Sequence, residues 1–330
     1  MMKKLVLSIA VFSVACGLAA ATDRPAKGFE ATYTATLNDV PAGLKEITVW
    51  IPLPVSRGVQ TVSDVVIDSP YEWRKAKDQE FGNEYAVTTT ANPPAGALAF
   101  KVHFKALRHE ERIDHPAETK ATKAELARAL RADRMVTLSP RVRKLANEVT
   151  AGKSGPVEQA HAIYEHLLAT MKYDKTVPGW GKGDTERACD IRAGNCTDFH
   201  SLFMSLARAK GIPTRFIIGF PLTAKDGMVA GYHCWAEFWV EGKGWIPVDA
   251  SDASKLTNPE AREYLFGHLD PDRVQFTMGR DLNLTPRTAE PLNYFIYPHA
   301  EADGKEVGKP AVQLEFRAAQ QMAGGVTAGE

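Results

Sequence analysis

The first third of the chain alternates apolar and polar positions with the period of β-strands. Over residues 100–105, Phe and Val alternate with Lys and His, which is the pattern of a strand with one buried face. The segments 29–37 and 45–53 have a similar pattern and are rich in Thr, Val, Ile and aromatic residues. Prolines break these runs. The pattern predicts a small antiparallel β-sandwich over residues 22–110.

Helical spacing replaces this alternation from about residue 110. We expect helices over 121–134 and 141–151. A stronger helix opens at Pro156, and its apolar residues recur at three- and four-residue steps as far as Met171. A glycine-rich loop over 173–195 separates it from a helix at 197–210, which Gly and Pro follow closely.

The rest of the chain returns to β-structure. Strands are expected at 214–220, 232–240 and 245–249. The tail from 292 to 317 has the pattern of a β-hairpin that turns at Asp303-Gly304. Sheet and helix segments are therefore largely segregated along the chain, which indicates an α+β fold.

The first 21 residues differ from all the others. Two lysines precede an apolar run from Leu5 to Ala15, and three alanines close the segment. This is the organisation of a secretory signal peptide cleaved after Ala21. Two alternatives are a lipoprotein modified at Cys16, which a loose lipobox precedes, and a membrane anchor, which needs about 20 apolar residues. We favour cleavage, and hence a periplasmic or secreted protein without stable membrane insertion.

Charge and cysteine content reduce the number of possible functions further. The 330 residues carry 40 basic and 40 acidic side chains, so no basic excess points to a nucleic acid partner. Cleavage would leave Cys189, Cys196 and Cys234, an odd number for an oxidising compartment. An unpaired thiol in such a compartment is the first indication of chemistry.

Cys196 lies where a thiol is activated. It follows the turn residues Gly194 and Asn195 at the start of a helix, where the local dipole stabilises a thiolate and lowers its pKa. His233 opens a strand 37 residues later, and Asp249 ends the strand after that. A thiol nucleophile, an imidazole base and a carboxylate that orients the base form a Cys-His-Asp arrangement for acyl transfer.

Two segments around these residues read RAGNCTDFHSLFMSLARAKGIPTRFIIGF and GYHCWAEFWVEGKGWIPVDAS. They resemble bacterial transglutaminase-like proteins of the papain-like cysteine enzyme superfamily. The resemblance is strong over about 140–255, and it implies a helix bearing the cysteine packed on an antiparallel sheet bearing the other two residues. It places the family's catalytic residues at Cys196, His233 and Asp249. The expected organisation is a signal peptide (1–21), a β-sandwich (22–110), a transglutaminase-like domain (111–288), a C-terminal hairpin (289–318) and a loose tail (319–330).

The resemblance also shapes the expected reaction. Animal transglutaminases have Gln and Trp beside the nucleophile, where this chain has Asn195 and Thr197. Hydrolysis of an amide or peptide bond is therefore favoured over crosslinking, with peptides, proteins or cell-wall amides as substrates. The backbone N–H of Cys196 and the loop around Trp180 would stabilise the oxyanion. A non-catalytic binding module on the same scaffold is the alternative, and no cofactor or metal is expected.

The remaining polar residues near this motif have several interpretations. Asp198 and His200 are expected on the helix surface or behind the site. A zinc site from Cys189, Cys196, His200 and Cys234 has enough ligands, but the spacing matches no familiar zinc motif. Strand parity turns Cys234 away from His233, so Cys234 should not compete at the site. It either pairs with Cys189 or both remain buried thiols, and Cys196 stays free.

Strand register decides whether the carboxylate can reach the imidazole. Direct pairing of Val240 with Trp245 would put Asp249 and His233 on opposite faces of the sheet. Pairing of Val240 with Gly244 puts both residues on one face as diagonal neighbours. That register requires an odd-length turn or a bulge, and glycine suits the left-handed conformation of such a turn. Without it, Asp252 or Glu237 would have to replace Asp249.

Overall fold

The computed structural model describes residues 25–222 and 226–319. The signal peptide expected at 1–21 and nearly all of the tail expected to be loose lie outside these residues. Within them, no helix is both long enough and apolar enough to cross a membrane.

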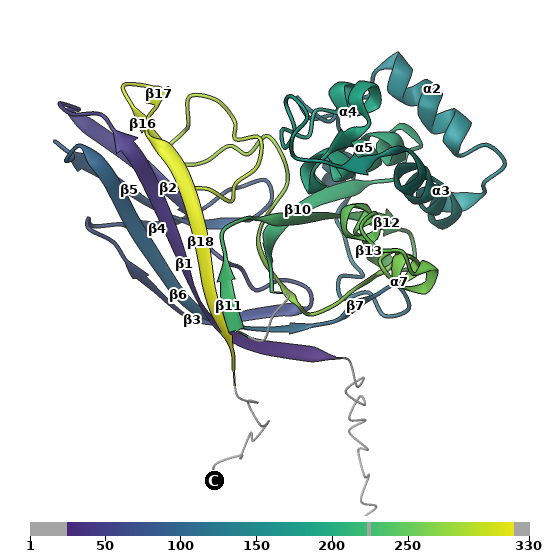
Figure 1. Cartoon of the computed structure of the whole chain (residues 1–330), viewed down its shortest axis with the longest axis horizontal. Helices are drawn as coiled ribbons and strands as arrows, with labels where there is room; N and C mark the ends of the chain where they lie inside the picture. The colour runs from purple at the N-terminus through teal and green to yellow at the C-terminus, as the bar shows by residue number, and fades with distance from the viewer. Residues whose placement is uncertain (1–24, 223–225, 320–330) are drawn as a thin grey trace, which may run out of the picture.

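Two five-stranded antiparallel sheets form the β-rich half of the protein (Figure 1). The first has the order β11-β18-β1-β6-β3, with β11 at Asp226–Val229, β18 at Lys309–Ala318, β1 at Ala26–Val40, β6 at Gly96–His109 and β3 at Gln60–Asp68. The second has the order β17-β16-β2-β5-β4, with β17 at Lys305–Glu306, β16 at His299–Ala302, β2 at Glu46–Pro52, β5 at Glu84–Ala91 and β4 at Arg74–Lys77.

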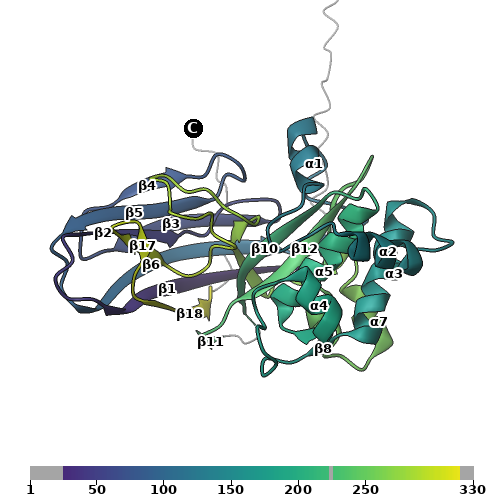
Figure 2. The ribbon, with the colours of Figure 1, turned by 90° about the horizontal axis from the view of Figure 1, so that it is seen from above.

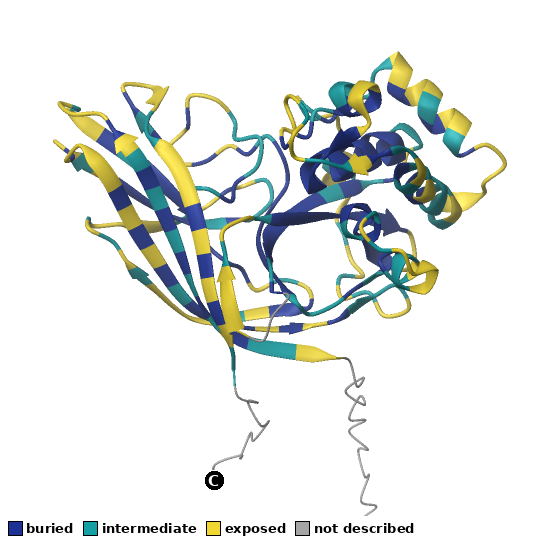
Figure 3. Cartoon of the chain, viewed as in Figure 1, coloured by how far each residue is buried: buried dark blue, intermediate teal, exposed yellow. Residues whose placement is uncertain are grey.

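Alternation of side chains explains how these sheets pack. Along β1, buried and partly exposed residues alternate from Phe29 to Leu37, and the stripes of β1, β6 and β18 are visible in Figure 3. Tyr33 on β1 and Val49 on β2 belong to one apolar core. The sandwich expected from the sequence is therefore confirmed, although it also includes strands from the C-terminal end of the chain.

The second half packs helices on a four-stranded antiparallel sheet (Figure 2). The sheet has the order β13-β12-β10-β15, with β13 at Gly244–Val248, β12 at His233–Val240, β10 at Thr214–Pro221 and β15 at Arg273–Met278. The helices are α1 at Lys123–Ala129, α2 at Pro140–Val149, α3 at Gly155–Thr170, α4 at Thr185–Ile191, α5 at Cys196–Ala209, α6 at Ala250–Ala253 and α7 at Pro259–Tyr264.

Helix α5 forms the centre of this half. Nearly all of its residues are buried, because helices α2, α3 and α4 pack around it and its inner face lies on β10 and β12. Two short two-stranded sheets complete the fold. In one, β7 at Glu111–Arg112 pairs with β14 at His268–Leu269, and in the other, β8 at Lys172–Tyr173 pairs with β9 at Ala193–Gly194.

The expected helices and strands agree with the structure except in three places. The helix expected over 121–134 is shorter, because α1 ends at Ala129 and Leu130 caps it. The glycine-rich segment 173–195 contains helix α4, whose N-cap Asp184 accepts hydrogen bonds from the N–H groups of Glu186 and Arg187. The expected hairpin over 292–317 is wrong in its extent. The turn at Asp303-Gly304 joins β16 to β17 in the second sheet, whereas β18 pairs with β1 in the first sheet.

Candidate active site

Cys196 is the first residue of α5 and is 1% exposed. Asn195 caps the helix, and its side-chain oxygen accepts the N–H of Thr197 at 3.0 Å. Asp198 completes a capping box by accepting the N–H of Asn195 at 3.0 Å. The N–H of Cys196 has no helical carbonyl to bond, because the first turn of a helix leaves its N–H groups unpaired.

Asp198 also anchors the glycine-rich loop that precedes α4. Its fully buried carboxylate accepts the N–H groups of Gly181 at 2.8 Å and Gly183 at 3.1 Å. Gly194 makes room for it, since a Cβ there would lie 2.2 Å from the Asp198 carboxylate. The N–H of Trp180 also has a partner, the carbonyl of Val177 at 3.4 Å. The second oxyanion donor expected from this loop stays a prediction.

His233 and Asp249 are hydrogen-bonded, as the register argument requires. Val240 pairs with Gly244, and Gly242 occupies the three-residue turn with a φ of +76°. The Nε2 atom of His233 lies 2.6 Å from Oδ2 of Asp249. This leaves Nδ1 for the hydrogen bond between His233 and Cys196. Both the register and the odd-length turn expected from the sequence are confirmed.

Both oxygens of the Asp249 carboxylate accept further hydrogen bonds. Oδ2 also accepts a hydrogen bond from Nη1 of Arg273 on β15 at 2.9 Å. Oδ1 accepts the hydroxyl of Ser251 at 3.1 Å and the N–H of Asp252 at 3.0 Å, since Asp249 is the N-cap of α6. Asp252 lies 3.3 Å from Nε2 of His233 and is a second carboxylate beside the ring.

The electrostatics favour a thiolate–imidazolium pair. Burial alone would raise the pKa of Cys196, but its hydrogen bonds with Cys234 and His233 outweigh this and hold the pKa well below its ordinary value. Burial would lower the pKa of His233, but Asp249 and Asp252 raise it to about 10. Burial opposes ionisation of Asp249 as well, and the charges of His233 and Arg273 still hold its pKa well below the usual range.

A second thiol and a second imidazole lie on the other side of Asp249. His200 is fully buried on α5, with Nε2 3.6 Å from Oδ1 of Asp249 and Nδ1 3.8 Å from Sγ of Cys234. Burial lowers the pKa of His200 and raises that of Cys234. Strand parity predicts that Cys234 points away from His233 and does not compete as the nucleophile. Its side chain still lies close to the site, because α5 covers that face of the sheet and the Cys234 thiol contacts Cys196.

All three cysteines in the described residues are free thiols. This agrees with the expected free Cys196 and settles the alternatives for Cys189 and Cys234 in favour of unpaired, buried thiols. The considered zinc set is not formed either. Among the described residues, the groups that could hold a metal consist of a histidine with two carboxylates, and neither contains a cysteine.

Sequence reasoning missed Arg273 and Tyr232. The Tyr232 hydroxyl accepts the side-chain amide of Asn195 at 3.0 Å and lies 2.9 Å from the Thr197 hydroxyl, so it spans both neighbours of Cys196. Tyr232 precedes His233, and this adjacency was the available signal. No local sequence signal pointed to Arg273, because this residue reaches Asp249 only through the pairing of β15 with β10.

Comparison with known proteins identifies this half of the molecule. Residues 143–250 match the family model of the transglutaminase-like superfamily. The chain carries a transglutaminase-like domain. The matched segment of this domain includes Cys196, His233 and Asp249.

Three similar proteins place the transglutaminase-like domain in context. An uncharacterised protein of Haemophilus influenzae is 28% identical over 356 aligned positions, which cover 92% of this chain and 95% of that protein. A protein-glutamine gamma-glutamyltransferase of Pseudomonas aeruginosa is 28% identical over 128 residues, covering 34% of this chain but only 18% of that protein. The crystal structure of a candidate cysteine protease from Cytophaga hutchinsonii superposes with a TM-score of 0.62 at 15% identity, covering 90% of this chain and 92% of that chain. This last likeness shows a shared fold.

Proposed function

We propose that the protein is an exported cysteine enzyme that transfers the acyl group of an amide through a thioacyl intermediate. The observation that carries this proposal is the buried contact of the Cys196 thiol with an imidazole that Asp249 holds at 2.6 Å. A thiolate stabilised in this way attacks carbonyl carbon at neutral pH.

The reaction follows from the protonation of this pair. The Cys196 sulfur attacks the amide carbonyl carbon, and the protonated His233 gives its proton to the leaving nitrogen as the C–N bond breaks. Water then loses a proton to the neutral ring and attacks the thioester carbon, and breaking of the C–S bond releases the carboxylic acid and restores the thiolate–imidazolium pair. Asp249 holds the Nε2–H of His233 throughout. The unpaired N–H of Cys196 is placed to stabilise the oxyanion.

We favour hydrolysis over crosslinking. Both reactions share the thioacyl intermediate and differ in whether water or an amine resolves it. Asn195 and Thr197 flank the nucleophile here, in place of the Gln and Trp of animal transglutaminases. We propose a peptide, a protein or a cell-wall amide as the substrate.

We also propose that the protein acts outside the cytoplasm. The support is the N-terminal sequence, in which a basic start, an apolar run and a small-residue end follow one another within 21 residues. Cleavage there would leave a chain that begins three residues before the first described residue, Pro25.

Trapping the thioacyl intermediate tests the proposed function. The protein is incubated with activated acyl esters and glutamine- or peptide-amide probes, quenched in acid and weighed by mass spectrometry. We expect one added acyl group on Cys196, which disappears on standing as water resolves the thioester. The Cys196→Ala variant is the control. Reversible peptide binding with no acyl adduct would support the alternative, a binding module on the same scaffold.

A further inference from the structure

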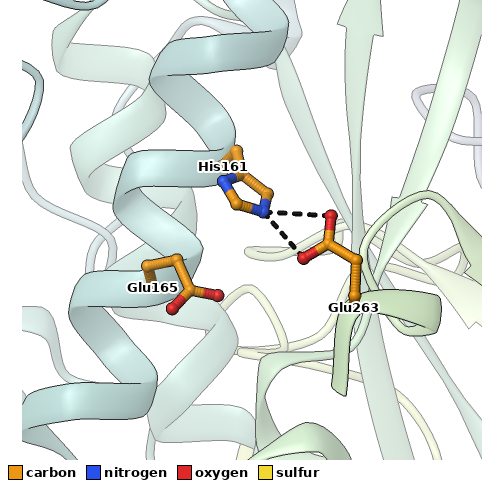
Figure 4. Close-up of side chains that lie close together, drawn as sticks. All are labelled: His161, Glu165 and Glu263. Carbon is orange, nitrogen blue, oxygen red and sulfur yellow. Dashed lines mark hydrogen bonds and ion pairs between the residues drawn. The ribbon is translucent and has the colours of Figure 1, made fainter. Parts of the chain in front are cut away.

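Three potential metal ligands lie close together on helices α3 and α7, and two of them are exposed (Figure 4). His161 and Glu165 lie one turn apart on α3, and Glu263 comes from α7. The Nε2 atom of His161 lies 3.0 Å and 3.2 Å from the two carboxylate oxygens of Glu263. One donor atom from each of the three residues lies within 4.8 Å of the other two.

The charges of this group are unevenly paired. Glu165 makes no hydrogen bond or ion pair with the other described residues, although its carboxylate lies beside that of Glu263. A single imidazole, with at most one positive charge, therefore faces two carboxylates. An ion pair between His161 and Glu263 accounts for the contact of these two residues, but it does not account for the position of the Glu165 carboxylate.

The imidazole is also held in a fixed orientation. The His161 ring packs edge-on against Phe266 at a centroid distance of 4.7 Å and an interplanar angle of 82°. Its other neighbour is Tyr164, at 6.2 Å. These contacts point Nε2 toward the carboxylates, so the ligand set is oriented before any ion binds.

We propose that His161, Glu165 and Glu263 bind one divalent transition-metal ion, of which Zn²⁺ is the probe. Ligands at about 2.0–2.1 Å from a tetrahedral Zn²⁺ lie about 3.3 Å from one another. The Nε2 atom of His161 lies 3.0 Å and 3.2 Å from the Glu263 oxygens, and the Glu165 donor lies within 4.8 Å of the donors of both residues. An imidazole nitrogen with two carboxylates suits Zn²⁺ better than Mg²⁺ or Ca²⁺, which prefer all-oxygen sites. Water would complete the shell, because both carboxylates are exposed.

The ion would join two helices that reach the candidate active site. The Tyr164 hydroxyl on α3 already donates to the carbonyl of Arg262 on α7. Two residues after Glu263, the carbonyl of Leu265 accepts the N–H of Asp249 at 3.0 Å. An ion at this position would therefore stabilise the segment that holds Asp249, without contact with the reacting atoms.

Calorimetric titration of the full chain with ZnCl₂ tests the site, alongside thermal unfolding with and without the ion. Glu165→Gln is the most informative variant, because it removes a carboxylate that has no other partner and should leave the metal-free protein as stable as before. His161→Gln and Glu263→Gln remove the other two ligands. The matched controls are His166→Gln on the same helix and Glu260→Gln on α7.

The second group of a histidine with two carboxylates is His233, Asp249 and Asp252, and the comparison between variants separates it from this one. We expect micromolar binding that weakens at least tenfold in each of the three ligand variants and is unchanged in both controls. Zinc should also raise the unfolding temperature of the parent but not of Glu165→Gln. Equal zinc binding by parent and Glu165→Gln, or binding at millimolar concentration only, would overturn the proposal. Because the experiment measures zinc binding and not turnover, its result tests the metal site independently of the proposed acyl transfer.

Discussion

Two thiol–imidazole pairs lie on either side of one carboxylate, and their chemistry differs. Cys196 and His233 form the first pair, with the imidazole 2.6 Å from Asp249. Cys234 and His200 form the second, with the imidazole 3.6 Å from the same carboxylate. The pKa of the thiol is lowered in the first pair and raised in the second.

Backbone position accounts for this difference. Cys196 opens a helix, where the unpaired N–H groups and the dipole stabilise negative charge, whereas Cys234 lies within a buried strand. His233 gains a short charge-assisted hydrogen bond. In contrast, Nε2 of His200 is buried without a hydrogen-bond partner among the described residues, and burial lowers the pKa of its ring. Burial therefore opposes the thiolate in both pairs, and only at Cys196 do the partners of the charged form outweigh it.

Replacing each cysteine in turn should give the largest contrast. We expect Cys196→Ala to reduce amide or ester turnover by about 10⁴-fold or more, as for other nucleophile deletions. Cys234→Ala should retain activity within about tenfold, because it removes one hydrogen bond to the thiolate, at roughly 1.5 kcal/mol. Steady-state kinetics on the same substrate measures both. Equal losses would mean that the two thiols act as a unit.

Asp249→Asn should produce the next largest effect. The amide keeps the shape of the side chain but cannot stabilise the imidazolium, so we expect turnover to fall about 10²-fold or more and the pKa of His233 to fall with it. His200→Gln is the matched change on the other side of the carboxylate and should leave the pKa of His233 nearly unchanged. NMR titration of the imidazole signals follows both, and a shift of the His233 pKa in the His200 variant alone would reverse the assignment.

Arg273 supports the orientation of Asp249 and should matter less. Arg273→Met removes a charged hydrogen bond of about 1.5–3 kcal/mol, so we expect turnover to fall at least tenfold while KM stays similar. Arg273→Lys keeps the charge and should recover part of the loss. Unchanged turnover in the Met variant would show that the other partners of Asp249 hold its carboxylate without Arg273.

The change of the reaction rate with pH should be the smallest of these effects near neutral pH. Activity requires Cys196 deprotonated and His233 protonated, so the rate should stay high through neutral pH and fall as pH approaches about 10, the pKa of His233. The same group affects stability. Its pKa in the unfolded chain is about 6.5, so its stabilising contribution is complete below that pH and is lost as pH rises through about 10. Stopped-flow rates and urea unfolding across this range measure the two effects.

Local sequence patterns were enough to predict much of the fold and the central geometry of the site. The start of α5 follows from Gly194 and Asn195, and the pairing of Val240 with Gly244 follows from parity. Long-range contacts could not be read in this way. Arg273 comes to Asp249 through strand order, and Cys234 meets Cys196 because α5 covers that face of the sheet. Parity gave the correct face for Cys234, but it could not say what packs against it.

The pH dependence of Cys196 alkylation tests the thiolate–imidazolium pair most directly. The rate of reaction with iodoacetamide is measured in the Cys234→Ala background, with tandem mass spectrometry to locate the adduct. We expect the midpoint well below the free-cysteine value of ~8.5, and an upward shift when His233→Ala removes the imidazole. A midpoint at or above ~8.5, or one that His233→Ala leaves in place, would contradict the pair.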